Sequence, residues 1–267
     1  MAEEKFSLWH GPPSIPAAAT FAVLFAITSF YHTWQAYRLR SKFMIAFIIG
    51  GYFEVGGYIG RIAAHSNLTS MGIYIWQTLL LLLSPTLFAA SIYMTLGRII
   101  LHTRGEHLAP IARTKLTKIF VIGDIFSFIV QSGGGAMMSK ASSQNTGKVI
   151  VLIGLAIQVI MFGIFIGTSA VFHKRLSTSP TTESSNAPWK KYMYGLYVTS
   201  ALIFIRSVFR ILEFQGGHNG VLMTTEFFIY IFDAAPMLGV MLVFNLVHPG
   251  ELISSYKNVD GTPLSHV

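Results

Sequence analysis

Eight ionisable side chains interrupt stretches of the chain that are otherwise apolar. Five are acids and three are arginines: Glu54, Arg61, Asp124, Arg206, Arg210, Glu213, Glu226 and Asp233. Such groups can pair as structural links between helices, bind a charged ligand or exchange protons. Pairing alone does not account for the whole set, because five acids against three bases leave two negative charges unmatched. These two carboxyls are either protonated or available to a cationic ligand or to protons.

The polar residues recur at helical spacing, which places them on single helix faces. Glu54, Tyr58 and Arg61 stand at i, i+4 and i+7, on one side of an α-helix. The seven-residue step recurs in four further pairs, two of which enclose another polar residue: Asp124 and Gln131; Arg206 and Glu213 with Arg210; Glu226 and Asp233 with Tyr230; and, more weakly, Gln77 and Ser84. We therefore expect five helices to line one polar cavity, with Glu54, Asp124 and Asp233 near its floor and the first and fifth helices toward lipid.

The composition indicates that this cavity lies inside a membrane. Hydrophobic residues make up 52% of the 267 residues and charged residues only 11%, whereas soluble domains carry about 25% charged residues. Seven stretches have the roughly 20 apolar residues that a spanning helix needs: Ile15–Tyr37, Phe43–His65, Met71–Ile99, Leu116–Met138, Lys148–Phe172, Tyr192–Phe214 and Leu222–His248. The sequence thus predicts an all-α, seven-transmembrane helix bundle over residues 15–250, without a separate soluble domain.

Basic residues predict how the bundle is oriented. They gather in the loops after the first, third and fifth predicted spans, including the segment from Arg104 to Lys118, whereas the opposite loops hold few. By the positive-inside rule, residues 1–14 form an extracellular amino-terminal segment and residues 251–267 a short cytoplasmic tail. The sequon Asn67-Leu68-Thr69 then falls in an outer loop. Most of the net charge of +8 reflects this bias, so we expect no nucleic-acid partner.

Several chemistries are excluded by missing residues. There is no cysteine, no lysine in the last span for a retinal Schiff base, and no phosphate-binding loop. The histidines show no HxxxH pair and fall at predicted span ends or in loops, where we expect interfacial side chains: His32, His65, His102, His107, His173, His218 and His248. No nucleophile–base set or metal set can be assembled. The sequence therefore favours a protein that is not an enzyme and uses neither metal nor cofactor.

Glycines and prolines predict local irregularities. We expect a kink at Ser84-Pro85, a hinge at Asp233 with Pro236, and an unwound turn at Gly133-Gly134-Gly135, where three consecutive glycines weaken the helix by about 1 kcal/mol each. The segment 177–188 is rich in Ser, Thr and Pro, which is typical of a flexible loop.

Several motifs together resemble one fungal family. They are Phe53-Glu54-Val55-Gly56-Gly57-Tyr58-Ile59-Gly60-Arg61, then Gln131-Ser132-Gly133-Gly134-Gly135, the Gly154 to Gln158 stretch, Arg206-Ser-Val-Phe-Arg210-Ile-Leu-Glu213, Gly216-Gly217, Glu226, Tyr230, Asp233 and His248-Pro249-Gly250. In this order they resemble the resistance-to-aminocholesterol (RTA-like) family of lipid-translocating exporters, over nearly the whole chain. The resemblance implies a seven-span protein of the fungal plasma membrane that handles sphingoid long-chain bases, aminosterols or azoles, and in some members porphyrins.

The leading hypothesis is therefore a flippase-like exporter of amphipathic amines. Glu54, Asp124 and Asp233 would attract the ammonium group or exchange protons, while Arg61, Arg206 and Arg210 position the carboxylates. A seven-span lipid receptor is the alternative, with the basic loop from Arg104 to Lys118 as its surface for a cytoplasmic partner. Transport of a porphyrin- or haem-type amphiphile is a third hypothesis. The substrate, the coupling ion and the oligomeric state stay open.

Overall fold

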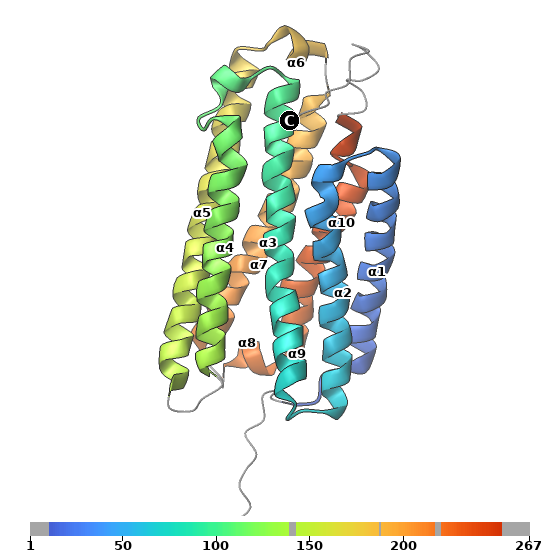
Figure 1. Cartoon of the computed structure of the whole chain (residues 1–267), viewed down its shortest axis with the longest axis vertical. Coiled ribbons are helices and arrows are strands. Elements are labelled where there is room, and N and C mark those ends of the chain that lie inside the picture. Colours follow the sequence, from blue (N-terminus) through green and yellow to red (C-terminus); the bar gives the residue numbers. More distant parts are fainter. Residues whose placement is uncertain (1–10, 139–142, 187, 217–219, 253–267) are drawn as a thin grey trace, which may run out of the picture.

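A bundle of long helices makes up the protein (Figure 1). The structure is a computed structural model that describes residues 11–138, 143–186, 188–216 and 220–252. Across these ranges there is no strand, and the elements are α1 (Ile15–Arg38), η1 (Lys42–Met44), α2 (Ile45–Ser66), α3 (Met71–His102), η2 (Glu106–Leu108), α4 (Arg113–Met138), α5 (Gln144–Thr178), α6 (Thr182–Asn186), α7 (Trp189–Gly216), α8 (Val221–Thr224), α9 (Glu226–Ile229), the π-helical η4 (Tyr230–Ala234) and α10 (Ala235–Leu246).

Seven helical segments are long and apolar enough to cross a membrane, which confirms the predicted fold class. They also turn large apolar side chains outward: Phe30, Ile122 and Ile160 each have 60% or more of their surface exposed. A water-soluble protein of this size rarely exposes contiguous apolar surface. Together these observations describe a multi-pass membrane protein.

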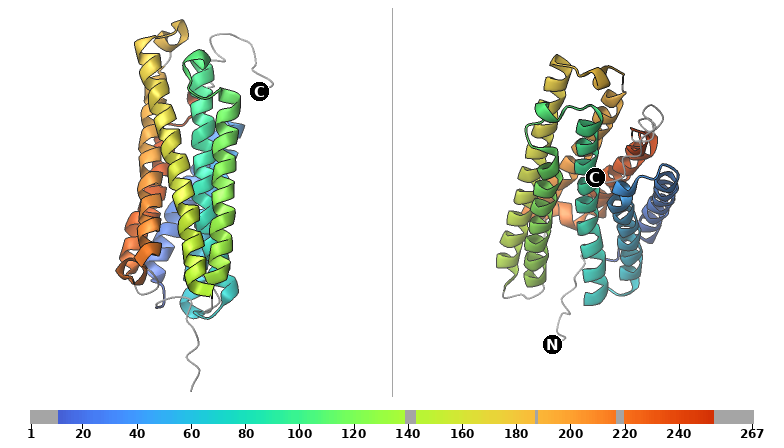
Figure 2. Two further views of the ribbon diagram at one scale, coloured as in Figure 1. Left: turned by 90° about the vertical axis from the view of Figure 1, so that its left-hand side faces the viewer. Right: turned by 45° about the horizontal axis from the view of Figure 1, so that its top comes forward.

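Helix α3 holds the two halves of the bundle together. It packs against α2 on one side and α4 on another, and it also contacts α7. Helices α4 and α5 form an antiparallel pair on one flank, while α1 and α10 close the other flank (Figure 2). We call the two ends of the bundle the α6 end, at the top of Figure 1, and the α9 end, at its bottom.

Close packing, and not unwinding, explains the three consecutive glycines. Helix α4 continues through them to Met138, so the predicted unwound turn is wrong. A Cβ added at Gly134 would lie 2.8 Å from the carbonyl oxygen of Gly147, whereas one added at Gly133 or Gly135 would meet nothing within 4 Å. The middle glycine lets the backbones of α4 and α5 touch.

The last span is irregular, though continuous, where the sequence predicts a hinge. Its helix starts at Glu226, later than the predicted Leu222, and widens into the π-helical segment Tyr230–Ala234 before α10 begins. Pro236 lacks an N–H group, so the carbonyl of Phe232 cannot receive the usual α-helical bond. A π turn re-spaces the chain at this point, and Asp233 lies inside it. Such turns occur frequently at functional sites.

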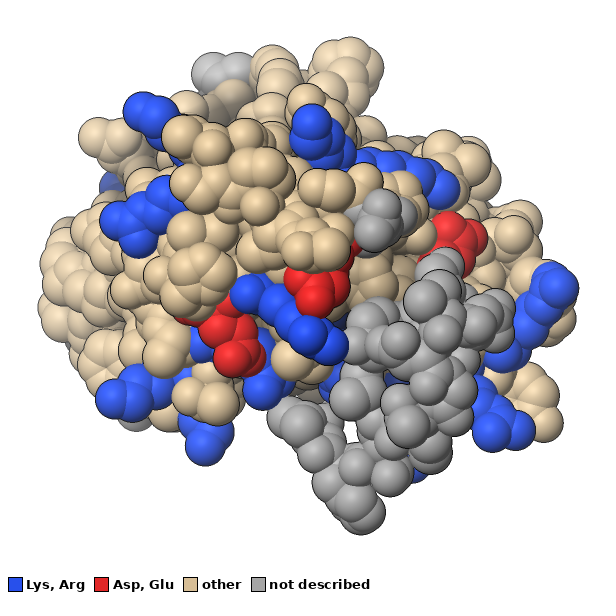
Figure 3. Space-filling view, turned by 90° about the horizontal axis from the view of Figure 1, so that it is seen from above, with Lys and Arg blue, Asp and Glu red and all other residues tan. Residues whose placement is uncertain are grey.

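Charge separates the two ends of the bundle. Figure 3 shows the α6 end, where lysines and arginines are spread over the surface with a few acidic residues among them. The described basic residues of the loops and helix ends there are Arg38, Arg40, Lys42, Arg98, Arg104, Arg113, Lys115, Lys118, Lys174, Arg175, Lys190 and Lys191, and Lys148 is the described lysine near the α9 end. Part of the predicted flexible loop is helical, since Thr182–Asn186 form α6, and the Thr181 hydroxyl donates to the carbonyl of Thr103 at 2.6 Å.

Candidate functional site

Six of the eight ionisable residues meet in three ion pairs. The Arg61 Nη2 and Glu226 Oε1 atoms are 2.5 Å apart, which joins α2 to α9. Arg206 Nε lies 2.7 Å from Asp233 Oδ1, and this pair joins α7 to the π-helical segment. The third pair is local to α7, with Arg210 Nη1 2.9 Å from Glu213 Oε2. The polar faces of α2, α7 and the last span therefore converge, as their spacing predicts.

Glu54 is the carboxylate that these pairs leave over. Its side chain is 2% exposed, interacts electrostatically with Arg206 and Asp233, and has one oxygen, Oε1, without a hydrogen-bond partner. Tyr58 is one turn further along α2, equally buried, and its hydroxyl also has no partner. With every group ionised, the cluster holds four carboxylates against three guanidinium groups. We call these residues the acidic cluster: Glu54, Tyr58, Arg61, Arg206, Arg210, Glu213, Glu226, Tyr230 and Asp233.

A proline in α3 helps to fix the central arginine. Pro85 lies inside α3 and has no N–H group, so the carbonyl of Leu81 lacks its usual partner four residues later. The Arg206 Nη2 atom donates to this carbonyl at 2.9 Å. Pro85 thus contributes to the site: it leaves the Leu81 carbonyl free, and this carbonyl holds Arg206 beside Asp233.

The acidic cluster opens toward the α9 end. Glu226 has a side chain that is 33% exposed, whereas the values are 7% for Arg61 and 4% for Asp233. The backbone N–H of Ser14 donates to Glu226 Oε2 at 2.9 Å, so the residue before α1 also contributes to this rim. Glu226 is therefore the exposed rim of the cluster, whereas Asp233 and Glu213 are buried.

Aromatic rings form one wall of the cluster. Phe21 of α1 stacks on Tyr230 and on Tyr58, with centroid distances of 5.4 and 5.8 Å. The guanidinium of Arg61 lies over the ring of Tyr230 at 5.5 Å, and its Nε donates to the Tyr230 hydroxyl. An apolar, stacked wall beside charged groups is suited to an amphipathic ligand.

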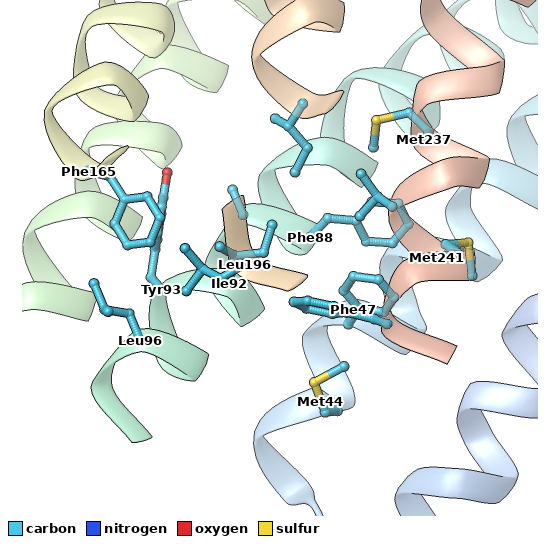
Figure 4. Close-up of a cluster of buried hydrophobic side chains, with 14 of the residues drawn as sticks. Met44, Phe47, Phe88, Ile92, Tyr93, Leu96, Phe165, Leu196, Met237 and Met241 are labelled. Carbon is cyan, nitrogen blue, oxygen red and sulfur yellow. The ribbon is translucent and has the colours of Figure 1, made fainter. Parts of the chain in front are cut away.

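Three of the predicted site residues lie outside the acidic cluster: Asp124, Gln131 and Gln77. Asp124 of α4 accepts a 2.7 Å hydrogen bond from the hydroxyl of Tyr93, and Gln131 donates to Ser127 and to Gln158 of α5. Figure 4 shows Tyr93 turned toward Phe165, away from Phe88 on the side of α3 that faces α2. The structure thus divides the single predicted cavity into the acidic cluster and a second polar seam between α3, α4 and α5. Gln77 is 6% exposed and packs against Gly60 of α2.

Sequence reasoning missed the partners of this second seam and the burial of two histidines. Tyr93 lies in an apolar run that gives no signal of its role. His32 and His248 are fully buried among neighbouring helices, which their predicted positions at span ends did not indicate. The described ranges contain no group of three or more His, Cys, Asp or Glu side chains that could hold a metal ion.

Comparison with known proteins places the chain in a family. Residues 47–256 match the family model described as RTA1 like protein. The chain belongs to the RTA1-like family. It is 36% identical to Protein RTA1 of Saccharomyces cerevisiae over 93% of this chain and 87% of that protein. It is also 36% identical to Protoporphyrin uptake protein 1 of the same yeast, over 91% of this chain and 92% of that protein.

A more distant relative is named for a sphingoid lipid. The chain is 29% identical to Sphingoid long-chain base transporter RSB1 of S. cerevisiae, over 91% of this chain and 74% of that protein. No solved structure matches the chain. Two of these three relatives are thus named for the uptake or transport of an amphipathic molecule.

Proposed function

We propose that the protein exports amphipathic amines, such as sphingoid long-chain bases, across the plasma membrane of a fungus, and that it is a transporter and not an enzyme. The excess acid of the cluster carries the proposal: three arginines are paired, and Glu54 is left in a site that is open at one end. A singly charged ammonium group would balance it. Burial of an uncompensated carboxylate inside a membrane is costly, so its retention favours a functional role.

The orientation follows from the basic end of the bundle. With the α6 end in the cytoplasm, by the positive-inside rule, the acidic cluster opens to the outside. The headgroup would rest between Glu54 and Asp233, and the alkyl chain would lie against the apolar surface of the bundle. Arg206 would release part of its attraction to Asp233 when the ammonium group arrives, because the two cations compete for the same carboxylates.

A porphyrin-type amphiphile is the second candidate. It is supported by the relative named for protoporphyrin uptake and by the aromatic wall of Phe21, Tyr58 and Tyr230 next to Arg61. Stacked rings suit a planar macrocycle, and a guanidinium suits its carboxylates. The two candidates carry opposite charges near Glu54: the ammonium group of an amine is attracted by this acid, whereas the carboxylate of a porphyrin is repelled by it.

The test is lipid movement by purified protein in liposomes. Fluorescent sphinganine and protoporphyrin IX are followed between leaflets for wild type, Glu54→Gln, and Glu106→Gln, a control with the same change on an exposed loop acid. We expect Glu54→Gln to reduce sphinganine movement by roughly tenfold or more, since about 1.4 kcal/mol of lost attraction corresponds to that factor. Glu106→Gln should match wild type.

Each other outcome points away from this mechanism. Unchanged movement in Glu54→Gln removes Glu54 from the mechanism. Faster protoporphyrin movement in Glu54→Gln, with no sphinganine movement in any protein, favours the porphyrin. Tight sphinganine binding without any movement favours a lipid receptor, for which the loop from Arg104 to Lys118 is the candidate partner surface. Two arginines of that loop already face acids of this chain, Arg104 with Glu183 and Arg113 with Glu106.

A further inference from the structure

A second buried polar group lies near the α6 end, outside the acidic cluster. It is formed by His32 and Gln35 of α1, Ser41 of the following loop, Asn245 of α10 and His248 just after it. His32 and His248 are fully buried, and their ring centroids are 6.0 Å apart. We call these five side chains the inner polar group. Neither the family match nor the relatives' names assign it a role.

Backbone contacts orient three of these side chains, and each of the five has a buried polar atom without a hydrogen-bond partner. His32 Nε2 lies 3.0 Å from the carbonyl of Met241, Gln35 Nε2 donates to the carbonyl of Asn245 at 2.9 Å, and the N–H of Gly250 donates to His248 Nδ1 at 3.0 Å. The buried atoms without a partner are His32 Nδ1, Gln35 Oε1, Ser41 Oγ, Asn245 Oδ1 and His248 Nε2. Buried polar atoms are rarely left unpaired, since each costs about 1–3 kcal/mol.

The same contacts fix the hydrogen-bonding sense of both rings. His32 Nε2 faces a carbonyl and must carry the proton, so its Nδ1 is an acceptor. His248 Nδ1 receives an N–H group, so its Nε2 carries the proton and is a donor. With the two amide oxygens, the group offers three acceptors, one donor and the Ser41 hydroxyl. A complementary ligand is rich in N–H or O–H donors and has at least one acceptor oxygen, as an amino-alcohol has.

An aromatic seal separates this group from the acidic cluster. Phe47 lies two turns before Glu54 on α2 and contacts His32 at a centroid distance of 4.8 Å. It also packs on Phe88 of α3 at 4.4 Å and on Phe244 of α10 at 5.3 Å, and all three rings are almost fully buried. Figure 4 shows Phe47 and Phe88 side by side, near Met241.

The other side of the inner polar group is closed by the chain after α10. Pro249, Gly250 and Leu252 are buried there, and a Cβ at Gly250 would lie 2.9 Å from Ser41 Cβ. Glu251 ties this segment to α7 through Lys191 Nζ at 3.6 Å. Two polar regions are thus aligned along α1, α2 and α10, with an apolar seal between them and a cover at the α6 end.

We propose that the inner polar group is a second binding site on the translocation pathway, which takes the amine and hydroxyl groups of the amphiphile on the cytoplasmic side, before the Phe47–Phe88–Phe244 seal opens toward the acidic cluster. The proposal rests on the proposed function. It specifies where the headgroup binds between the acidic cluster and the cytoplasmic face. It also attributes the specificity for an amino-alcohol to the three acceptors and one donor of the inner polar group.

The absence of cysteine from the chain permits a direct test. Ser41→Cys replaces one unpartnered hydroxyl by a thiol, and Asn245→Cys serves as a second variant at the same site. The purified proteins in liposomes are treated with a small cationic methanethiosulfonate reagent, with and without sphinganine. Ser169→Cys on α5 is the buried control, because its hydroxyl is fully buried and already donates to the carbonyl of Phe165.

We expect sphinganine to protect the thiol at position 41 or 245 but not at position 169. When sphinganine is present at roughly ten times its Kd, only about one site in eleven is free at any time. Labelling of the thiol should therefore slow about tenfold. Phe47→Ala should increase labelling by reagent added from the α9 end, since the seal is weakened. Protection that disappears in Gln35→Leu would locate the effect in the inner polar group.

Two results overturn the proposal, and they can be told apart. If sphinganine binds and is moved but both thiols react unchanged, the inner polar group holds water only and the proposed function stands. If sphinganine neither binds nor moves in wild type, the inner site and the proposed function fail together.

Discussion

The Arg206–Asp233 ion pair allows the sharpest test of the acidic cluster. Both side chains are about 5% exposed, and Arg206 also donates to the carbonyl that Pro85 leaves free. Arg206→Met would remove the ion-pair partner of Asp233 and the arginine that acts on Glu54, and it would leave the Leu81 carbonyl unpaired. Removing one partner of a buried pair costs about 3–5 kcal/mol. For a chain of this size that corresponds to a melting temperature lowered by about 6–20 °C.

Substitution of the other partner, Asp233, should reduce the free energy of unfolding by less. In Asp233→Asn, Arg206 keeps Glu54 as a neighbouring carboxylate, so we expect a loss of about 1.5–3 kcal/mol, the value of a hydrogen bond to a charged group. The double variant should be more stable than the sum of the two losses predicts, with a coupling of about 1–3 kcal/mol.

The assay is the free energy of unfolding in lipid–detergent micelles, measured for the two single variants and the double variant. Glu183→Gln is the control, because its pair with Arg104 has side chains that are 29% and 65% exposed. Such a surface pair contributes about 1 kcal/mol or less. The reasoning is refuted if Arg206→Met costs no more than this control, or if the two single losses add to within about 0.5 kcal/mol.

Three further predictions concern packing, the second polar seam and topology. Gly134→Val should unfold the α4–α5 contact and lower the melting temperature sharply, whereas Gly133→Ala, which meets no neighbour, should be neutral or stabilise by about 0.5–1 kcal/mol. Tyr93→Phe removes the hydroxyl bonded to a buried carboxylate and should cost about 1–3 kcal/mol in unfolding free energy, while sphinganine movement through the acidic cluster stays near wild type; loss of movement would join the two seams functionally. Asn67→Cys should react with an impermeant maleimide on intact cells and Ser185→Cys only after permeabilisation, and the reverse pattern would invert the proposed orientation.

Much of the fold and part of the site could be predicted from the sequence. Apolar run lengths gave the seven spans, and the seven-residue spacing of Arg206 with Glu213 and of Glu226 with Asp233 predicted which faces converge. The count of five acids and three bases anticipated two unpaired carboxylates, which the structure identifies as Glu54 and Asp124.

What the sequence could not give is the rotation of each helix about its own axis. Asp124 has the same spacing signal as Glu54, yet α3 stands between them, because one face of α3 meets α2 and another meets α4. The spacing of polar residues within one helix could not identify Tyr93 or His32, because their partners lie on other helices. The three glycines of α4 misled for a similar reason: the helix penalty of glycine suggested unwinding, whereas Gly134 serves a close contact with Gly147 on another helix, α5.

The bond between Arg206 and the Leu81 carbonyl has a consequence for how this chain can change in evolution. Proline at position 85 without the arginine leaves a buried acceptor unsatisfied, at about 1–3 kcal/mol. Any other residue at 85 supplies its own N–H to Leu81, so the guanidinium is then no longer needed to satisfy this carbonyl. Loss of the arginine alone is therefore penalised, so the proline should be inherited only together with the arginine. A homologue that has lost the arginine should have lost the proline too, and grafting an α7 without the arginine should fail unless an α3 without the proline accompanies it.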